Sequence, residues 1–193
     1  MEIDWAEVGR ILSESVNRPR HHAGFFHWHE KSLKEWGIAQ SFREELERDG
    51  VTTIISSKQH PGGENHAPDY EFTTDGGAVW GIEITELVDQ KAIETAQHGR
   101  RLFPDWSDEE LLAAIETLID KKDRPKNVRG GPYDRYLLLV HTDEDILSAQ
   151  RIQAAIGSRK FSTSLIDDIY VLVSYDPTEG RLPLLKFDTS RVS

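Results

Sequence analysis

The segment PDYEFTTDGGAVWGIEITE, residues 68–86, decides the fold because it reads as two β-strands joined by a tight turn. The turn is the stretch 75–77, Asp-Gly-Gly, whose adjacent glycines supply the positive φ values that a short hairpin loop requires. If these residues form the whole loop, stepping outward along both strands places Asp69 directly opposite Glu83, on the same face of the sheet. A shorter loop would shift the pairing by one residue and send Asp69 to the other face.

Two carboxylates side by side on one face predict a cation site. They repel each other, so keeping both ionised in a partly buried place is costly unless a cation compensates. Mg²⁺ suits such a pair, because it takes one or two carboxylate ligands and fills its other positions with water or substrate phosphate oxygens. The alternative is a solvated hairpin in which Asp69 caps a turn and Glu83 faces water.

The dipeptide Pro68-Asp69 followed by Glu83-Ile84-Thr85 resembles the motif of the PD-(D/E)XK (restriction-endonuclease-like) nuclease superfamily, which is Pro-Asp, a variable gap, Asp or Glu, any residue, and Lys. The resemblance covers 68–86 directly and extends loosely, through the order of helices and strands, over about 30–175. It implies a restriction-endonuclease-like core and metal-dependent hydrolysis of nucleic acid, with DNA favoured, that leaves a 5′-phosphate. By the same resemblance, Asp69, Glu83 and the backbone carbonyl of Ile84 bind Mg²⁺ or Mn²⁺.

Thr85 departs from the motif, since the family expects Lys at this position. Some members of the family recruit the missing lysine from the following helix. The sequence predicts a helix over 107–122 with an apolar stripe, and Lys122 falls near the middle of that stripe while Lys121 lies at its flank. Lys122 is therefore the expected catalytic lysine and Lys121 the second choice, with Thr85 bonding the attacking water. Alternatively, the helix frays and Lys122 extends to solvent.

Glu45 is the candidate for a further acid, because some family members contribute one from the first core helix. In the run 39–48, Ala39, Phe42 and Leu46 share one face, and Glu45 is the glutamate nearest to it. The alternative is an ordinary solvated acidic face.

The hydrophobic patterns predict an α/β fold with a mixed central β-sheet flanked by helices. Helices are expected at about 2–16, 30–48, 87–98, 107–122 and 143–156, the last capped by Thr142 with Asp145. Strands are expected at about 51–56, 69–74, 78–85, 135–140 and 169–174, with a weaker one at 182–187 because of Pro183. A loop rich in Gly and Pro, 59–67, is expected to lie over the site.

Composition predicts one domain over 1–193 with an N-terminal helical extension at about 1–29. No apolar run of membrane-spanning length and no signal segment are visible, so a cytoplasmic location and no membrane partner are expected. The net charge of −11 argues against a simple nucleic-acid binder. However, the stretch 121–129 holds five cations within nine residues directly after the predicted helix, and it could form a basic rim or merely a solvated loop.

Three functional hypotheses remain open. The first is a Mg²⁺-dependent nuclease, with nucleic acid and a second copy of the chain as expected partners. The second is a catalytically inactive binding, regulatory or immunity-type protein that retains the nuclease fold, as Thr85 and the acidic charge suggest. The third is a metalloprotein built on the histidines His21, His22, His27 and His29, whose spacing fits a polar connector better. No nucleophile elbow and no phosphate-binding Gly-Lys-Ser/Thr loop is present.

Overall fold

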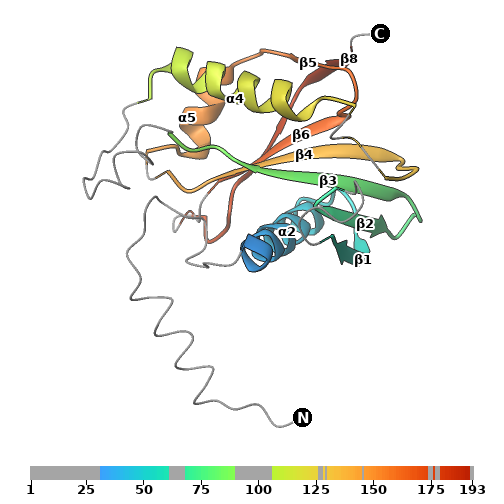
Figure 1. Ribbon diagram of the computed structural model, residues 1–193. Coiled ribbons are helices and arrows are strands. Elements are labelled where there is room, and N and C mark those ends of the chain that lie inside the picture. The colour runs from blue at the N-terminus through green and yellow to red at the C-terminus, as the bar shows by residue number, and fades with distance from the viewer. Residues whose placement is uncertain are drawn as a thin grey trace.

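The computed structural model describes residues 31–60, 68–89, 106–125, 128, 130–144, 146–173, 176 and 179–191. It is an α/β structure with a mixed six-stranded sheet between helices (Figure 1). The helices described are α2 (Lys31–Arg48), α4 (Asp108–Lys122) and α5 (Ala149–Ile156). The strands are β1 (Ile54–Gln59), β2 (Tyr70–Thr74), β3 (Val79–Glu86), β4 (Arg135–Thr142), β5 (Phe161–Thr163), β6 (Asp168–Val173), β7 (Leu184–Phe187) and β8 (Thr189–Arg191). The predicted α/β class and mixed sheet are confirmed.

The sheet runs in the order β1-β2-β3-β4-β6-β7. Its centre is parallel, because β4 lies between β3 and β6 and runs in the same direction as both. β1, β2 and β7 are antiparallel to their neighbours. β5 and β8 form a separate small parallel pair that the sequence did not reveal, since each strand has only three residues.

The β2–β3 hairpin has the predicted three-residue loop. The Thr74 amide donates to the Ala78 carbonyl at 2.9 Å, and Gly77 has a φ of 82°, in the left-handed region that favours glycine. The strands pair Tyr70 with Ile82 and so continue in the predicted register. One further step outward brings Asp69 opposite Glu83.

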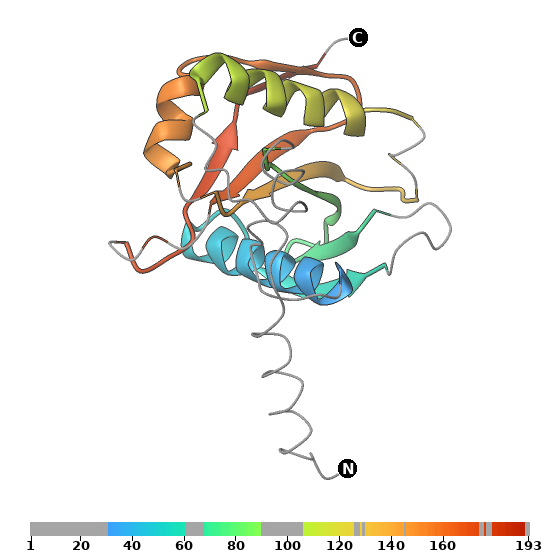
Figure 2. The ribbon, with the colours of Figure 1, turned by 60° about the vertical axis from the view of Figure 1, so that its left-hand side comes forward.

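Helices cover both faces of the sheet, so β4 and β6 are buried on both sides, whereas β3 is buried mainly on the α2 face. α2 lies on one face and α4 and α5 on the other, an arrangement visible in two views (Figures 1 and 2). On the α2 face, Phe42 packs with Phe72 and Tyr170. On the α4 face, Leu111, Ile115 and Ile119 enter a core with alternate residues of β4 and β6. β3 contributes Trp80, Ile82 and Ile84 to the core on the α2 face, and Glu83 lies on its other face, the side of α4.

The start of α4 is fixed by a capping box, as the sequence predicted. The Ser107 side chain accepts from the Glu110 amide, and the Glu110 carboxylate accepts from the Ser107 amide in return. The helix then runs without interruption to Lys122. Its end lies over the sheet, which places its last turn near β3.

Some predicted boundaries are wrong. The first strand begins at Ile54 instead of residue 51, because the Val51 amide still bonds to Leu46 at the end of α2. The helix expected from residue 143 begins at Ala149 with Ser148 as its cap, so Thr142 ends a strand instead. Of the helix expected at 87–98, residues 87–89 are described and are not helical, and 90–98 lie outside the described residues. The expected helix at 2–16, residues 61–67 of the loop expected over the site, the four-histidine cluster and Asp145 also lie outside them. Among the described helices, none is long and apolar enough to span a membrane.

Candidate active site

The predicted pair of carboxylates lies at the end of the hairpin. Asp69 precedes β2 and stands opposite Glu83, and its Oδ2 accepts a hydrogen bond from the backbone amide of Ile84 at 2.8 Å. That bond ties the Asp69 side chain to β3. The two carboxylates are close enough for the charge of Asp69 to raise the pKa of Glu83.

Each carboxylate oxygen of Glu83 has a donor. The Lys122 ammonium lies 2.5 Å from Oε1, and the Tyr136 hydroxyl donates to Oε2 at 3.3 Å. The Glu83 side chain is only 14% exposed and that of Lys122 only 21%. Two half-buried side chains of opposite charge, Glu83 and Lys122, therefore meet beside Asp69.

The electrostatic balance at Glu83 favours a further cation. Burial raises the pKa of Glu83 most, and the Asp69 charge adds to it, while Lys122 and Tyr136 act in the opposite direction. The net effect remains a rise, so one ammonium does not offset the cost of ionising Glu83 here. A divalent cation would lower that cost.

Lys122 reaches the pair because it continues the buried stripe of α4. Leu111, Ile115 and Ile119 are buried along that stripe, and Lys122 follows Ile119 by three residues, which is nearly one turn. Lys121 is exposed, as the sequence analysis expected. The prediction that Lys122 faces the sheet is confirmed, although its expected catalytic role stays a prediction.

Ile84 and Thr85 follow Glu83 along β3. The Ile84 side chain is buried on the α2 face, and its amide points toward Asp69. Since the amide and carbonyl of one strand residue address the same neighbouring strand, its carbonyl also faces the Asp69 side, as a ligand would need to. Thr85 is half-buried and shares the face of Glu83 by strand alternation.

Glu45, the acid predicted from the first helix, belongs to another part of the molecule. Its two oxygens lie 2.6 Å from nitrogens of Arg48 and Arg181. Glu35, on the same buried face of α2, is the acid near the site. Burial raises its pKa most, and the charge of Asp69 raises it further. Ten residues of helix separate the two glutamates by about 15 Å, so the expectation for Glu45 is wrong in its position along the helix.

A second carboxylate network flanks the first and was not foreseen. Glu71 follows Asp69 by two residues on the same face of β2. The Tyr133 hydroxyl donates to its Oε1 at 2.9 Å, and His60 Nε2 lies 3.2 Å from the same oxygen. These partners come from segments far apart in sequence, so no local pattern could reveal them.

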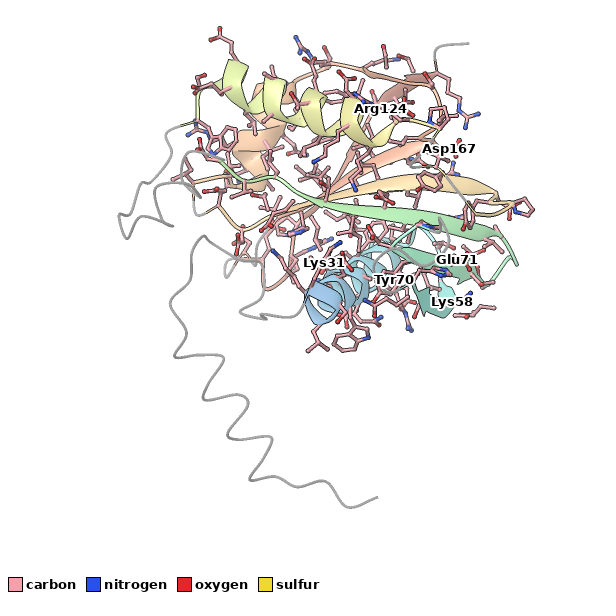
Figure 3. The ribbon with its side chains drawn as sticks, in the orientation of Figure 1. Lys31, Lys58, Tyr70, Glu71, Arg124 and Asp167 are labelled. Carbon is pink, nitrogen blue, oxygen red and sulfur yellow. The ribbon has the colours of Figure 1, made fainter. Side chains whose placement is uncertain are left out.

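Exposed cations lie on both sides of the sheet. Lys31, at the start of α2, is 76% exposed and pairs with Glu35 at 3.1 Å, and its pKa is raised by that bond and by the charges of Asp69 and Glu83. Lys121 and Arg124 are exposed at the end of α4. Figure 3 shows Lys31 and Arg124 on opposite sides of the sheet. Lys126 and Arg129, the rest of the predicted basic rim, lie outside the described residues.

The donor set fits Mg²⁺ or Mn²⁺ better than a metal that needs a full protein cage. Within the described ranges, no three His, Cys, Asp or Glu side chains converge closely enough to hold an ion. Mg²⁺ needs fewer protein ligands because it retains several waters. Asp69, Glu83 and the Ile84 carbonyl are all oxygen donors, as this ion prefers.

Comparison of the chain with protein-family models, with curated proteins and with solved structures finds no match. Any function proposed for the chain therefore rests on the geometry of the site and on the motif in its sequence.

Proposed function

We propose that this protein is a metal-dependent phosphodiester hydrolase of the PD-(D/E)XK kind, with a restriction-endonuclease-like core, acting on nucleic acid and preferentially on DNA. The observation that carries the proposal is the contact of Lys122 with Glu83 at 2.5 Å beside Asp69. Two acids and a lysine from three separate elements meet at one end of a hairpin. This is the set of groups that the motif resemblance demands, with the lysine supplied by α4 in place of Thr85.

Asp69, Glu83 and the Ile84 carbonyl would hold Mg²⁺ or Mn²⁺. Bound there, the cation would polarise the scissile phosphate and lower the pKa of a water molecule. Asp69 is already oriented by the Ile84 amide, so its second oxygen is directed away from that bond. Glu83 is held on both oxygens and needs only to release Lys122.

Lys122 supplies a positive charge that can move from Glu83 to the reacting groups. Released from Oε1, its ammonium would hold the attacking water and stabilise negative charge on the phosphate. Thr85, on the same face of β3, can bond the same water. Removing a donor of this kind costs about 10²–10³-fold in rate in other hydrolases.

The exposed cations support nucleic acid as the substrate. Lys31 lies close enough to the carboxylate pair for the charges of Asp69 and Glu83 to raise its pKa, and Lys121 and Arg124 are exposed near Lys122 in a protein that is otherwise strongly acidic. A local basic rim attracts a phosphate backbone even when the whole surface is acidic, and such attraction weakens with salt. Binding is therefore expected to decrease as salt is raised.

A cleavage assay tests the proposal. The full chain is incubated with single- and double-stranded DNA and RNA, with Mg²⁺ or Mn²⁺ and with chelator, and the products are examined for a 5′-phosphate. Wild-type protein should cleave only with the cation, and Asp69→Asn should not cleave. Cleavage that persists in chelator, or that survives Asp69→Asn, would refute the assignment of the site.

The second candidate function is a catalytically inactive protein of the same fold that binds a partner. The ion pair between Lys122 and Glu83 favours it, because an internal ammonium already compensates part of the acidic charge. The net charge of −11 also favours a basic partner over a phosphate backbone. This candidate predicts no divalent cation bound by Asp69 and Glu83, so a cation titration separates the two.

A further inference from the structure

Two tyrosines lie side by side over Gly81, two residues before Glu83. Tyr136 pairs with Gly81 across the parallel β3–β4 ladder. A Cβ at residue 81 would come within 2.9 Å of the Tyr136 ring and 3.0 Å of the Tyr133 ring. The two ring centroids are 5.9 Å apart and tilted by 50°. Only glycine at residue 81 leaves room for both rings at these positions.

The two hydroxyls reach two different carboxylates. The Tyr136 hydroxyl donates to Glu83 and the Tyr133 hydroxyl donates to Glu71. Burial raises the pKa of Tyr133 to about 12 and raises that of Tyr136 as well, so both hydroxyls remain protonated donors at neutral pH. The pair thus offers a natural comparison, because only the acceptor of Tyr136 belongs to the carboxylate pair.

Tyr136 and Lys122 hold opposite oxygens of Glu83, and they differ in charge. A divalent cation arriving at Oε1 repels the Lys122 ammonium, so that contact must break when the cation binds. The Tyr136 hydroxyl is neutral and addresses Oε2, so its bond can persist. At 3.3 Å that bond is longer than an ordinary O–H···O bond, and such bonds tighten when a site is filled.

We propose that Tyr136 is a positioning residue that keeps the Glu83 carboxylate facing Asp69 while the cation replaces Lys122. Gly81 leaves the space that the Tyr136 ring occupies. The inference rests on the proposed function, since it concerns the cation site of that function. Without Tyr136, the carboxylate of Glu83 would be free to turn once Lys122 leaves. Groups that orient a metal ligand in this way contribute about 10–100-fold to metal affinity.

The test compares Tyr136→Phe with Tyr133→Phe, each of which removes one hydroxyl and keeps the ring. Mn²⁺ binding to the full chain is measured by calorimetry. We expect Tyr136→Phe to weaken Mn²⁺ binding about tenfold or more and Tyr133→Phe to leave it within about twofold of wild type. Gly81→Ala should resemble Tyr136→Phe, because the added Cβ displaces the ring that carries the hydroxyl.

A second measurement needs no metal. With ¹³C-labelled glutamate, Tyr136→Phe should shift the Cδ resonance of Glu83, assigned through Glu83→Gln, and Tyr133→Phe should shift that of Glu71. A purely structural role of Tyr136 would reduce thermal stability without these selective effects.

The outcomes separate the inference from the function beneath it. If wild type binds Mn²⁺ and Tyr136→Phe binds it equally well, the positioning role is wrong and the proposed function stands. If Tyr133→Phe weakens binding as much as Tyr136→Phe, the role is not specific to Glu83 and is also wrong. If wild type binds no Mn²⁺, the proposed function fails and the inference fails with it.

Discussion

Glu83 is half-buried and Glu45 is buried, and both have basic partners, yet their surroundings differ in charge balance. Glu45 is 2% exposed and, with neighbouring Asp49, meets the two arginines Arg48 and Arg181. Glu83 meets one lysine and stands beside Asp69, so the negative charge there is in excess. The balanced cluster is complete in itself and joins α2 to the segment before β7. The unbalanced cluster keeps a net negative charge that a cation would compensate, and this difference distinguishes a structural ion cluster from a candidate active site.

Neutralising each glutamate in turn is the strongest test of the difference between Glu83 and Glu45. Glu83→Gln should reduce both Mn²⁺ affinity and the rate of DNA cleavage by more than about 100-fold, since a metal ligand contributes more than the groups that orient it. Glu45→Gln should leave both unchanged and should lower the free energy of unfolding by about 2 kcal/mol, because the contacts of the buried carboxylate with Arg48 and Arg181 are lost. Calorimetry, a cleavage assay and urea unfolding measure the three quantities. Equal effects of both substitutions on cation binding would show that Glu83 is no more a cation ligand than Glu45.

Lys122→Met tests whether the ammonium competes with the cation. Removing the positive charge next to Glu83 should strengthen Mn²⁺ binding by about tenfold, since like charges repel at this distance. The same substitution should slow cleavage about 10²–10³-fold because the transition state loses a positive group. Lys121→Met, at the exposed neighbour, is the matched control and should change neither Mn²⁺ binding nor the rate of cleavage at saturating DNA. Weaker cation binding in Lys122→Met would contradict the exchange of the two cations.

The double variant Thr85→Lys/Lys122→Met tests whether a lysine on β3, where the motif expects it, can replace Lys122. Thr85 is half-buried on the face of Glu83, so a long side chain there can reach the carboxylate pair. Cleavage should recover at least about tenfold over Lys122→Met alone, a part of what one such donor contributes. If activity stays at the level of the single variant, the site does not accept a lysine from residue 85.

Glu35→Gln is expected to give the smallest effect, on stability alone. Burial and then the Asp69 charge raise the pKa of Glu35 above its ordinary value of 4.5. A raised pKa in the folded state contributes stability below the ordinary value, and that contribution is lost as the pH rises through the raised value. Glu35→Gln should therefore increase the free energy of unfolding near neutral pH relative to wild type, and the gain should shrink under acidic conditions. If the stabilisation by Glu35→Gln instead grows as the pH falls, the pKa of Glu35 is not raised in the folded protein.

The hairpin was predictable from sequence because its determinants are local. The loop at 75–77 fixes the register, and the register places Asp69 opposite Glu83. Lys122 was predictable for a similar reason, since its angle follows from the stripe of Leu111, Ile115 and Ile119 on one helix. Both inferences used only geometry within one element or one turn.

The features of the site that the sequence did not predict depend on contacts between distant elements. Glu35 and Glu45 both lie on the buried face of α2, and only the docking of that helix decides which of its ends approaches Asp69. Tyr136 reaches Glu83 only because β4 lies parallel to β3 in one register. Gly81 could have indicated a close approach to another group, since a glycine inside a strand often does, but its partners could not be named.

The most direct test of the cation site is a Mn²⁺ titration of the full chain, with wild type and Asp69→Asn compared under identical conditions. Asp69 is the better target for this purpose, because its substitution leaves the contact between Lys122 and Glu83 in place. Saturable Mn²⁺ binding to wild type and its loss in Asp69→Asn, with both proteins folded to the same extent, is the expected result. Absence of binding to wild type, or equal binding to both, would contradict it.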